Sequence, residues 1–172
     1  MTAANRSTRL VLVTVGLLSV FSLAVFTNQA MVNAQSSEQK FTAKLTAKEE
    51  VPPNDSPATG MAWIKPSERE VGFEVNVTDI DKANAAHIHL GEKGKNGPVI
   101  VTLFKSDTPT ELKNGTLGEG NFTATNFEGP MKGKGMDDLI TAMKNGSTYV
   151  NVHTTDMPNG EIRGQLASNS TG

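Results

Sequence analysis

Cysteine is absent from the 172 residues of this chain, and aromatic residues make up only 5 % of them. Without thiols the chain can form no disulfide, no Fe–S cluster, no thiolate zinc site and no Cys nucleophile. A blue-copper site is excluded too, because it needs a Cys ligand. We therefore expect stability to come from β pairing and from a core built mainly of Val, Ile, Leu and Met.

A strong excess of one charge is also missing, since 16 Lys and Arg stand against 18 Asp and Glu. Residues 1–34 contain two of the arginines and no acid, so the remainder carries a net charge of −4. This modest acidity offers no basic surface for nucleic acid or for an anionic membrane. We expect no nucleic-acid partner, and contact with a membrane only if the N-terminal segment stays attached.

The first 34 residues have the order of features of a secretory signal. Arg6 and Arg9 form a positive start, residues 10–27 are an apolar run, and Val32-Asn33-Ala34 resembles a cleavage site. This predicts a signal peptide over residues 1–34. The alternative is an uncleaved anchor, because the apolar run is just long enough to span a bilayer. Either way, we expect the rest of the chain to be secreted or at the cell surface.

Short alternating runs separated by turn residues fill the rest of the chain between a polar lead-in, 35–40, and a polar tail, 168–172. They predict about eight strands in one β domain over residues 41–167. Residues 105–120 are expected to be a loop. Met136, Leu139, Ile140 and Met143 recur with the helical period and predict one short inserted helix. The pattern indicates an all-β fold, an antiparallel sandwich or flattened barrel. The expected strands are 41–45, 60–64, 71–77, 85–90, 98–104, 121–125, 148–154 and 161–166.

All three histidines lie in two of these strands. His87 and His89 flank Ile88, so both side chains point to one face of their strand. His153 lies in the expected strand 148–154, and the three can converge if the two strands are neighbours. Imidazole nitrogens suit copper or zinc. The structural alternative is that these histidines only bond to loop backbone, for example in the turn 91–97.

Five Asn-x-Ser/Thr sequons follow the predicted signal peptide, and such positions are expected on the surface of a glycosylated protein. The same number can also arise by chance in a chain rich in Asn and Thr. The candidate glycosylation sites are Asn76, Asn114, Asn121, Asn145 and Asn169.

Two longer motifs contain the histidines. The first runs from Ala86 to Val99 (AHIHLGEKGKNGPV), and the second from Tyr149 to Gln165 (YVNVHTTDMPNGEIRGQ). They resemble motifs of the CHRD domain, a module of chordin that also occurs in exported microbial proteins. The resemblance covers residues 41–167. It implies a Greek-key, immunoglobulin-like β sandwich but no particular reaction.

A more distant resemblance is to Cu/Zn superoxide dismutase. His87-Ile88-His89 resembles the copper-binding His-x-His strand of that family, and Val152-His153 resembles its later copper-ligand strand. The bridging histidine, the further zinc ligands and the disulfide cysteines of that family have no counterpart here. Arg163 is the cation that the resemblance offers beside the metal, although its spacing from His153 differs.

Three hypotheses follow. The first is a non-enzymatic extracellular module that binds a protein or surface partner and holds copper or zinc at the three histidines. The second is a copper redox enzyme of the superoxide-dismutase type, and the third is a surface-layer or filament subunit in which sheet edges pair between chains. We assign no catalytic residue, and no Gly-x-Ser-x-Gly elbow is present.

Overall fold

A computed structural model describes residue 1 and residues 39–169 of the chain. The predicted signal peptide apart from Met1, most of the polar lead-in and the end of the polar tail lie outside the described residues. All strands belong to one compact unit, Gln35–Gly172. Within the described residues no helix has the length and apolar character that a membrane span requires.

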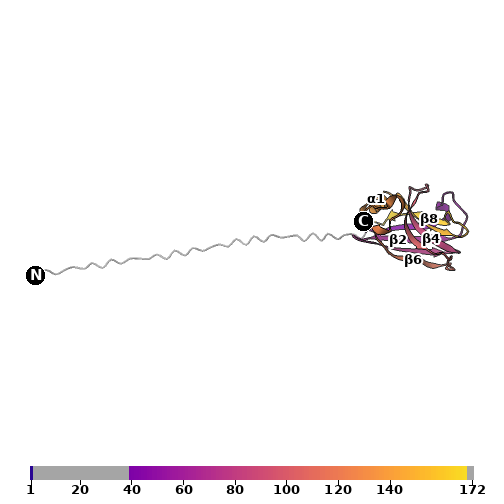
Figure 1. Cartoon of the computed structure of the whole chain (residues 1–172), viewed down its shortest axis with the longest axis horizontal. Coiled ribbons are helices and arrows are strands. Elements are labelled where there is room, and N and C mark those ends of the chain that lie inside the picture. The colour runs from indigo at the N-terminus through magenta and orange to yellow at the C-terminus, as the bar shows by residue number, and fades with distance from the viewer. Residues whose placement is uncertain (2–38, 170–172) are drawn as a thin grey trace. The chain divides into compact units, whose positions relative to one another are not determined.

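The domain contains nine strands and one α-helix among its described residues, with three short 3-10 helices between them (Figure 1). The strands are β1 Phe41–Thr46, β2 Thr59–Pro66, β3 Val71–Thr78, β4 Ala83–Leu90, β5 Val99–Lys105, β6 Gly115–Phe122, β7 Thr148–Thr154, β8 Ile162–Gln165 and β9 Ala167–Ser168. The helices are α1 Met136–Lys144 and the 3-10 helices η1 Ala47–Glu49, η2 Ala124–Asn126 and η3 Gly129–Met131.

The strands form one sheet in the order β5-β4-β7-β8-β1-β2-β3-β6, with β9 beside β1. Every recorded pair is antiparallel. The two ends of the sheet approach each other at Gly118 of β6, where an added Cβ would lie 3.2 Å from the Cβ of Phe104 in β5. The sheet is therefore a nearly closed, flattened barrel, which confirms the predicted all-β antiparallel fold with one helix.

The core lies inside this barrel and is mainly aliphatic, as expected from the composition. Ile64, Val75 and Ile88 are fully buried, and α1 adds Leu139 and Met143. Each such side chain contributes about 1.5–3 kcal/mol through burial. The expected dependence on aliphatic residues was incomplete, because Phe41, Phe122 and Phe127 are buried as well.

The prediction for residues 105–125 was wrong. Strand β6 begins at Gly115, inside the expected loop, and ends at Phe122, where a strand over 121–125 was expected. Three of its eight residues are glycine and only Leu117 and Phe122 are buried, so the alternating pattern is too weak to read. Pairing with β3 nevertheless defines this strand, from Val71↔Phe122 to Val77↔Gly115, with one register shift between Val75 and Asn76.

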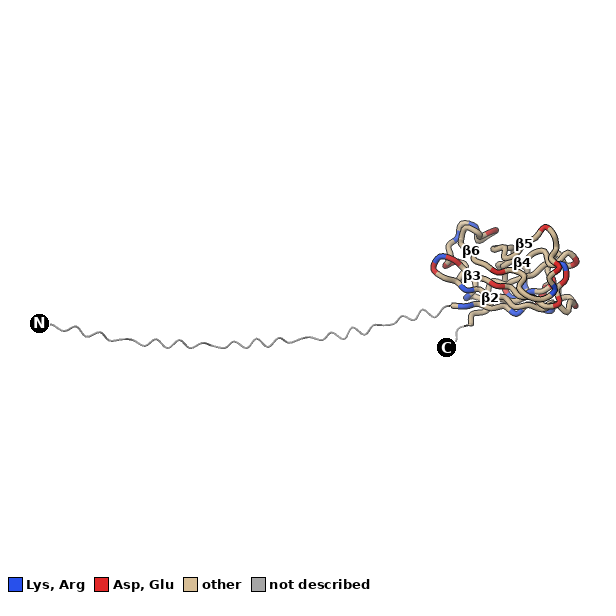
Figure 2. The backbone as a smooth tube through the Cα atoms, turned by 90° about the horizontal axis from the view of Figure 1, so that it is seen from below, with Lys and Arg blue, Asp and Glu red and all other residues tan. Residues whose placement is uncertain are grey.

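Acidic and basic residues are interspersed over the described domain (Figure 2). The same view places β2, β3 and β6 together on one side and β4 and β5 on the other. These two groups of strands carry the two surfaces considered below.

Candidate metal centre

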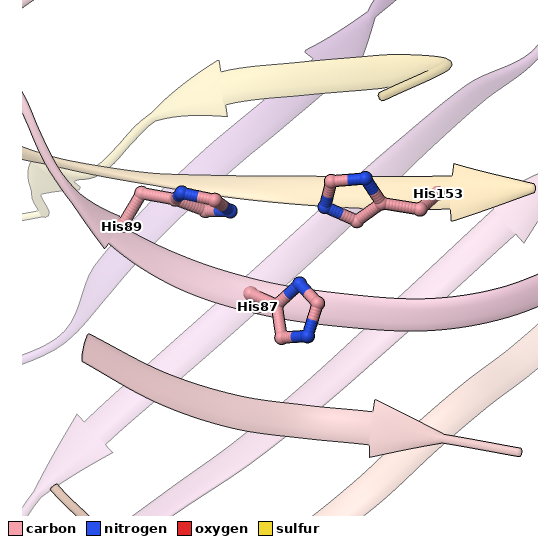
Figure 3. A group of neighbouring side chains, drawn as sticks. All are labelled: His87, His89 and His153. Carbon is pink, nitrogen blue, oxygen red and sulfur yellow. The ribbon is translucent and has the colours of Figure 1, made fainter. Parts of the chain in front are cut away.

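The three histidines lie on neighbouring strands, because β4 pairs with β7. His87 faces Asn151 across the pair, and His153 faces Ala85. The imidazole rings gather over the two strands with nitrogen atoms directed toward one another (Figure 3). One ring nitrogen from each histidine lies within 4.8 Å of the other two. The closest rings are those of His87 and His153, whose centroids are 4.9 Å apart.

The local shape of β4 depends on its other neighbour. The pairing of β4 with β5 shifts register twice, between Ala86 and His87 and again between Ile88 and His89. Such irregularities increase the twist of a strand and re-aim its side chains. On the opposite face of β4, Ala86 and Ile88 are fully buried in the core. The core therefore fixes the strand, and the histidines occupy its other face.

Two of the imidazoles are oriented by backbone carbonyls. Nδ1 of His89 is 2.9 Å from the carbonyl oxygen of Gly97, and Nδ1 of His153 is 3.0 Å from that of Pro158. A carbonyl only accepts, so Nδ1 carries the hydrogen in both rings and Nε2 keeps its lone pair. The backbone bonding that formed the structural alternative is present, and it leaves one nitrogen of each ring available as a ligand.

Three buried ring nitrogens have no hydrogen-bond partner among the described residues: Nδ1 of His87, Nε2 of His89 and Nε2 of His153. Unsatisfied buried polar atoms are uncommon in folded proteins and call for an explanation such as an ion or a water molecule. These three belong to one cluster, so a single ion or water there would satisfy them together.

Burial keeps these rings neutral. It lowers the pKa of His87 to about 4, and the neighbouring His153 and His89 add to this effect. Burial also lowers the pKa of His89 and of His153, which the carbonyl bonds of Gly97 and Pro158 partly offset. At neutral pH all three imidazoles therefore have the protonation state that a metal requires.

A stack of planar groups supports His89 from the side of β8. The ring of Tyr149 lies parallel to that of His89, with centroids 4.8 Å apart, and the guanidinium carbon of Arg163 is 3.7 Å from the centre of the Tyr149 ring. Arg163 also donates to Oδ1 of Asn96 and to the carbonyl oxygen of Lys95. The loop 91–98, which supplies the Gly97 carbonyl, is thus fixed to β7 and β8.

A buried carboxyl, that of Glu50, lies beside Asn151 of β7, near the histidines and Arg163. Glu50 is 5 % exposed and accepts hydrogen bonds from Nδ2 of Asn151 at 3.0 and 3.1 Å. Burial raises the pKa of Glu50 to about 7, although the Asn151 bond and the charge of Arg163 act in the opposite direction. Glu50 therefore titrates near neutral pH in the folded protein.

This pKa predicts the effect of Glu50→Gln on stability. Between pH 4.5 and 7 the unfolded chain has Glu50 ionised while the folded chain has it protonated, so this group stabilises the fold less and less as pH rises through 7. The glutamine variant lacks this loss. We therefore expect the free energy of unfolding of Glu50→Gln, relative to that of the parent chain, to rise by about 2–3 kcal/mol from pH 4.5 to 7. Above pH 7 this difference should stay nearly constant.

Urea unfolding with EDTA, repeated across this pH range, measures the difference. Comparison with the parent chain removes the opposite pH dependence of the histidines, whose lowered pKa values make the fold lose stability as pH falls. Glu49→Gln, at the neighbouring and more exposed carboxyl, is the matched control. A difference that does not change with pH would contradict the prediction.

Several residues around the histidines were not identified from the sequence. Tyr149 and Asn151 share the strand parity of His153, which could have identified them, but no local signal marks Glu50 as buried. Glu161 and Arg163 are two residues apart, but their side chains have different partners. Glu161 accepts from the hydroxyls of Ser56 and Thr154, and Arg163 stacks on Tyr149.

The sequons differ in exposure. Asn76 is the exception to the expected surface position, since it is half-buried in β3, its Nδ2 donates to Glu74, and its Oδ1 is enclosed. A glycan there would require repacking of this side chain. Glycosylation of the others stays a prediction; the exposed sequon asparagines are Asn114, Asn121, Asn145 and Asn169.

Among known families, the CHRD domain matches residues 41–166 of the chain. The matched region spans β1 to β8 and so includes all three histidines. No curated protein and no solved structure matches the chain significantly.

Proposed function

The chain belongs to the CHRD domain family, whose members occur in extracellular or secreted proteins, and we propose that it is an extracytoplasmic binding module that holds a copper or zinc ion at His87, His89 and His153. The observation that carries the proposal is the set of three buried, unpartnered ring nitrogens in one cluster of the described residues. The match to the family supports the extracytoplasmic location.

The spacing of the nitrogens suits a metal after a small adjustment. Copper and zinc bind imidazole nitrogen at about 2.0–2.1 Å, so three donors spaced evenly around one ion lie about 3.4–3.6 Å apart. Nitrogens within 4.8 Å of one another reach this spacing when their separations shorten by about 1 Å. Three protein ligands leave a further position for water or another small ligand.

The donor set favours copper over zinc. All three donors are neutral imidazoles, which suit both metals, and Cu²⁺ binds nitrogen sites more tightly than Zn²⁺. We expect Cu²⁺ to bind the chain from residue 35 onward with a Kd below about 1 µM, and Zn²⁺ to bind more weakly.

Titration with each metal, followed by calorimetry, tests this proposal. His87→Ala and His153→Ala should each weaken Cu²⁺ binding at least 100-fold, because loss of a supporting group alone costs about 10–100-fold. Electron paramagnetic resonance of the Cu²⁺ complex should show three nitrogen ligands, and fewer in either variant. Asp156→Asn, an exposed acid on the loop after β7, is the control and should bind normally. Equal binding by both histidine variants and the parent chain would overturn the proposal.

Arg163, the cation that the superoxide-dismutase resemblance offers beside the metal, is not accessible in the structure. Arg163 is only 2 % exposed and its guanidinium is engaged by Asn96, Lys95 and Tyr149. We therefore expect the copper complex to remove superoxide no faster than the same amount of free copper. The filament alternative needs two open sheet edges, whereas β5 and β6 approach each other at Gly118, which favours a monomer in size-exclusion chromatography.

A further inference from the structure

A cavity lies on the outer face of β2, β3 and β6, away from the histidines on β4 and β7. It measures about 440 Å³, within the range of small-molecule sites. It lies where Trp63, Glu74 and Glu119 stand directly across from one another on the three strands. The next row on the same face is Lys65, Gly72 and Asn121. All six of these residues line the cavity.

Gly72 creates the hollow. Every other position in these two rows carries a long or planar side chain, so the missing side chain leaves a gap bounded by Lys65, Asn121 and the row of Trp63. A Cβ at position 72 would lie 3.2 Å from Oδ1 of Asn121. Even a small side chain there would begin to fill the cavity.

The polar groups around the hollow include both donors and acceptors. Neither Lys65 nor Glu119 has a hydrogen-bond or ion-pair partner recorded within residues 39–169. Glu74 accepts one bond, from Asn76, and the amide nitrogen of Asn121 donates to Glu70, which leaves its Oδ1 toward Gly72. The cavity thus combines a flat indole with free carboxylate, amide and ammonium groups.

The positions of the two carboxylates do not favour the stability of the sheet. Glu74 and Glu119 are directly opposite each other on β3 and β6, and like charges in that arrangement destabilise a sheet. Departures from such local rules concentrate at functional sites. A ligand whose hydroxyl groups donate to both carboxylates would relieve the repulsion.

We propose that this hollow binds a neutral saccharide, with one sugar ring stacked on Trp63 and its hydroxyl groups bonded to Glu74, Glu119 and Lys65. A sugar ring has a flat apolar face for the indole and hydroxyls that both donate and accept, which matches the mixed groups here. A strongly charged ligand of either sign fits less well, because Lys65 opposes a cation and the two glutamates oppose an anion.

Trp63 is the only tryptophan of the sequence, so its fluorescence reports on this cavity directly. The chain from residue 35 onward, made in a bacterial host without N-glycosylation, leaves Asn121 unmodified. We expect a β-1,4-linked tetrasaccharide of glucose or of N-acetylglucosamine to change the Trp63 emission with a Kd of about 0.1–1 mM. Calorimetry gives the same constant for variants without tryptophan.

Two variants and one control distinguish the loss of the binding site from a general change in the fold. Trp63→Ala should weaken binding at least tenfold. Gly72→Val should do the same by filling the hollow, although it removes no contacting group and valine suits a strand. Met61→Ala, on the same face of β2 but outside the cavity, should bind like the parent chain. The proposal is wrong if neither sugar binds at about 10 mM, or if both site variants bind the sugars as the parent chain does. It is also wrong if only a polyamine such as spermidine binds.

Discussion

Replacing Arg163 with alanine is expected to lower the free energy of unfolding by about 3–5 kcal/mol, the usual cost of removing one partner from a buried charged network. The side chain is 2 % exposed and makes three kinds of contact. It stacks on Tyr149, donates to Asn96 and Lys95, and lies close enough to Glu50 to lower the pKa of that carboxyl. Alanine removes all of these contacts and leaves Glu50 buried without its cation.

Urea unfolding monitored by circular dichroism measures this loss. Arg69→Ala is the matched control because Arg69 is exposed, and it should change stability by less than about 0.5 kcal/mol. Arg163→Lys keeps the charge but loses the planar stack and the two-bond fork, so an intermediate loss is expected. A loss of less than about 1 kcal/mol for the alanine variant would show that the network is not stabilising.

Gly97→Ala is expected to weaken Cu²⁺ binding about 10–100-fold, as changes to groups that orient metal ligands commonly do. An added Cβ at this position would overlap the carbonyl oxygen of Leu90, so the loop 91–98 has to move. The Gly97 carbonyl moves with it, and that carbonyl holds Nδ1 of His89. The same shift disturbs the bond from the Gly97 amide to the Tyr149 hydroxyl, 3.1 Å long.

Gly94→Ala, in the same loop, provides the comparison. Its φ of +77° disfavours alanine, but nothing lies within 4 Å of the added Cβ. It should therefore cost about 1 kcal/mol of stability and leave metal affinity unchanged. If Gly94→Ala and Gly97→Ala weaken Cu²⁺ binding equally, loop strain rather than the position of the Gly97 carbonyl accounts for the effect.

The parts of the fold that could be predicted depend on local pattern. Alternation in β4 and β7 placed Ile88 in the core and the histidines on the opposite face, and the helical period of Met136 to Met143 identified α1. The prediction that His87 and His153 lie close together depended on a condition, because no sequence pattern shows which strands are neighbours. Residues 83–90 and 148–154 become partners only once the whole sheet is arranged.

Long-range contacts explain what could not be predicted. Strand β6 has little alternation of its own and is defined by its partner β3. Glu50 follows a 3-10 turn among prolines and charged residues, where burial is unexpected, yet it lies under Asn151 of β7. Arg163 has the strand parity of an exposed residue and is covered because Tyr149 stacks on it and the loop 91–98 bonds to it.

The sheet order also has a consequence for the sequence of events in folding. β1, the first strand, lies in the middle of the sheet, where it pairs with β2 and with the two last strands, through Thr46↔Arg163 and Phe41↔Ser168. The centre of the sheet therefore cannot form until β8 and β9 are available. Pairing over such sequence distances is slow, and until then β1 can pair only with β2. Removing β8 and β9 would open the middle of the sheet rather than shorten one of its edges.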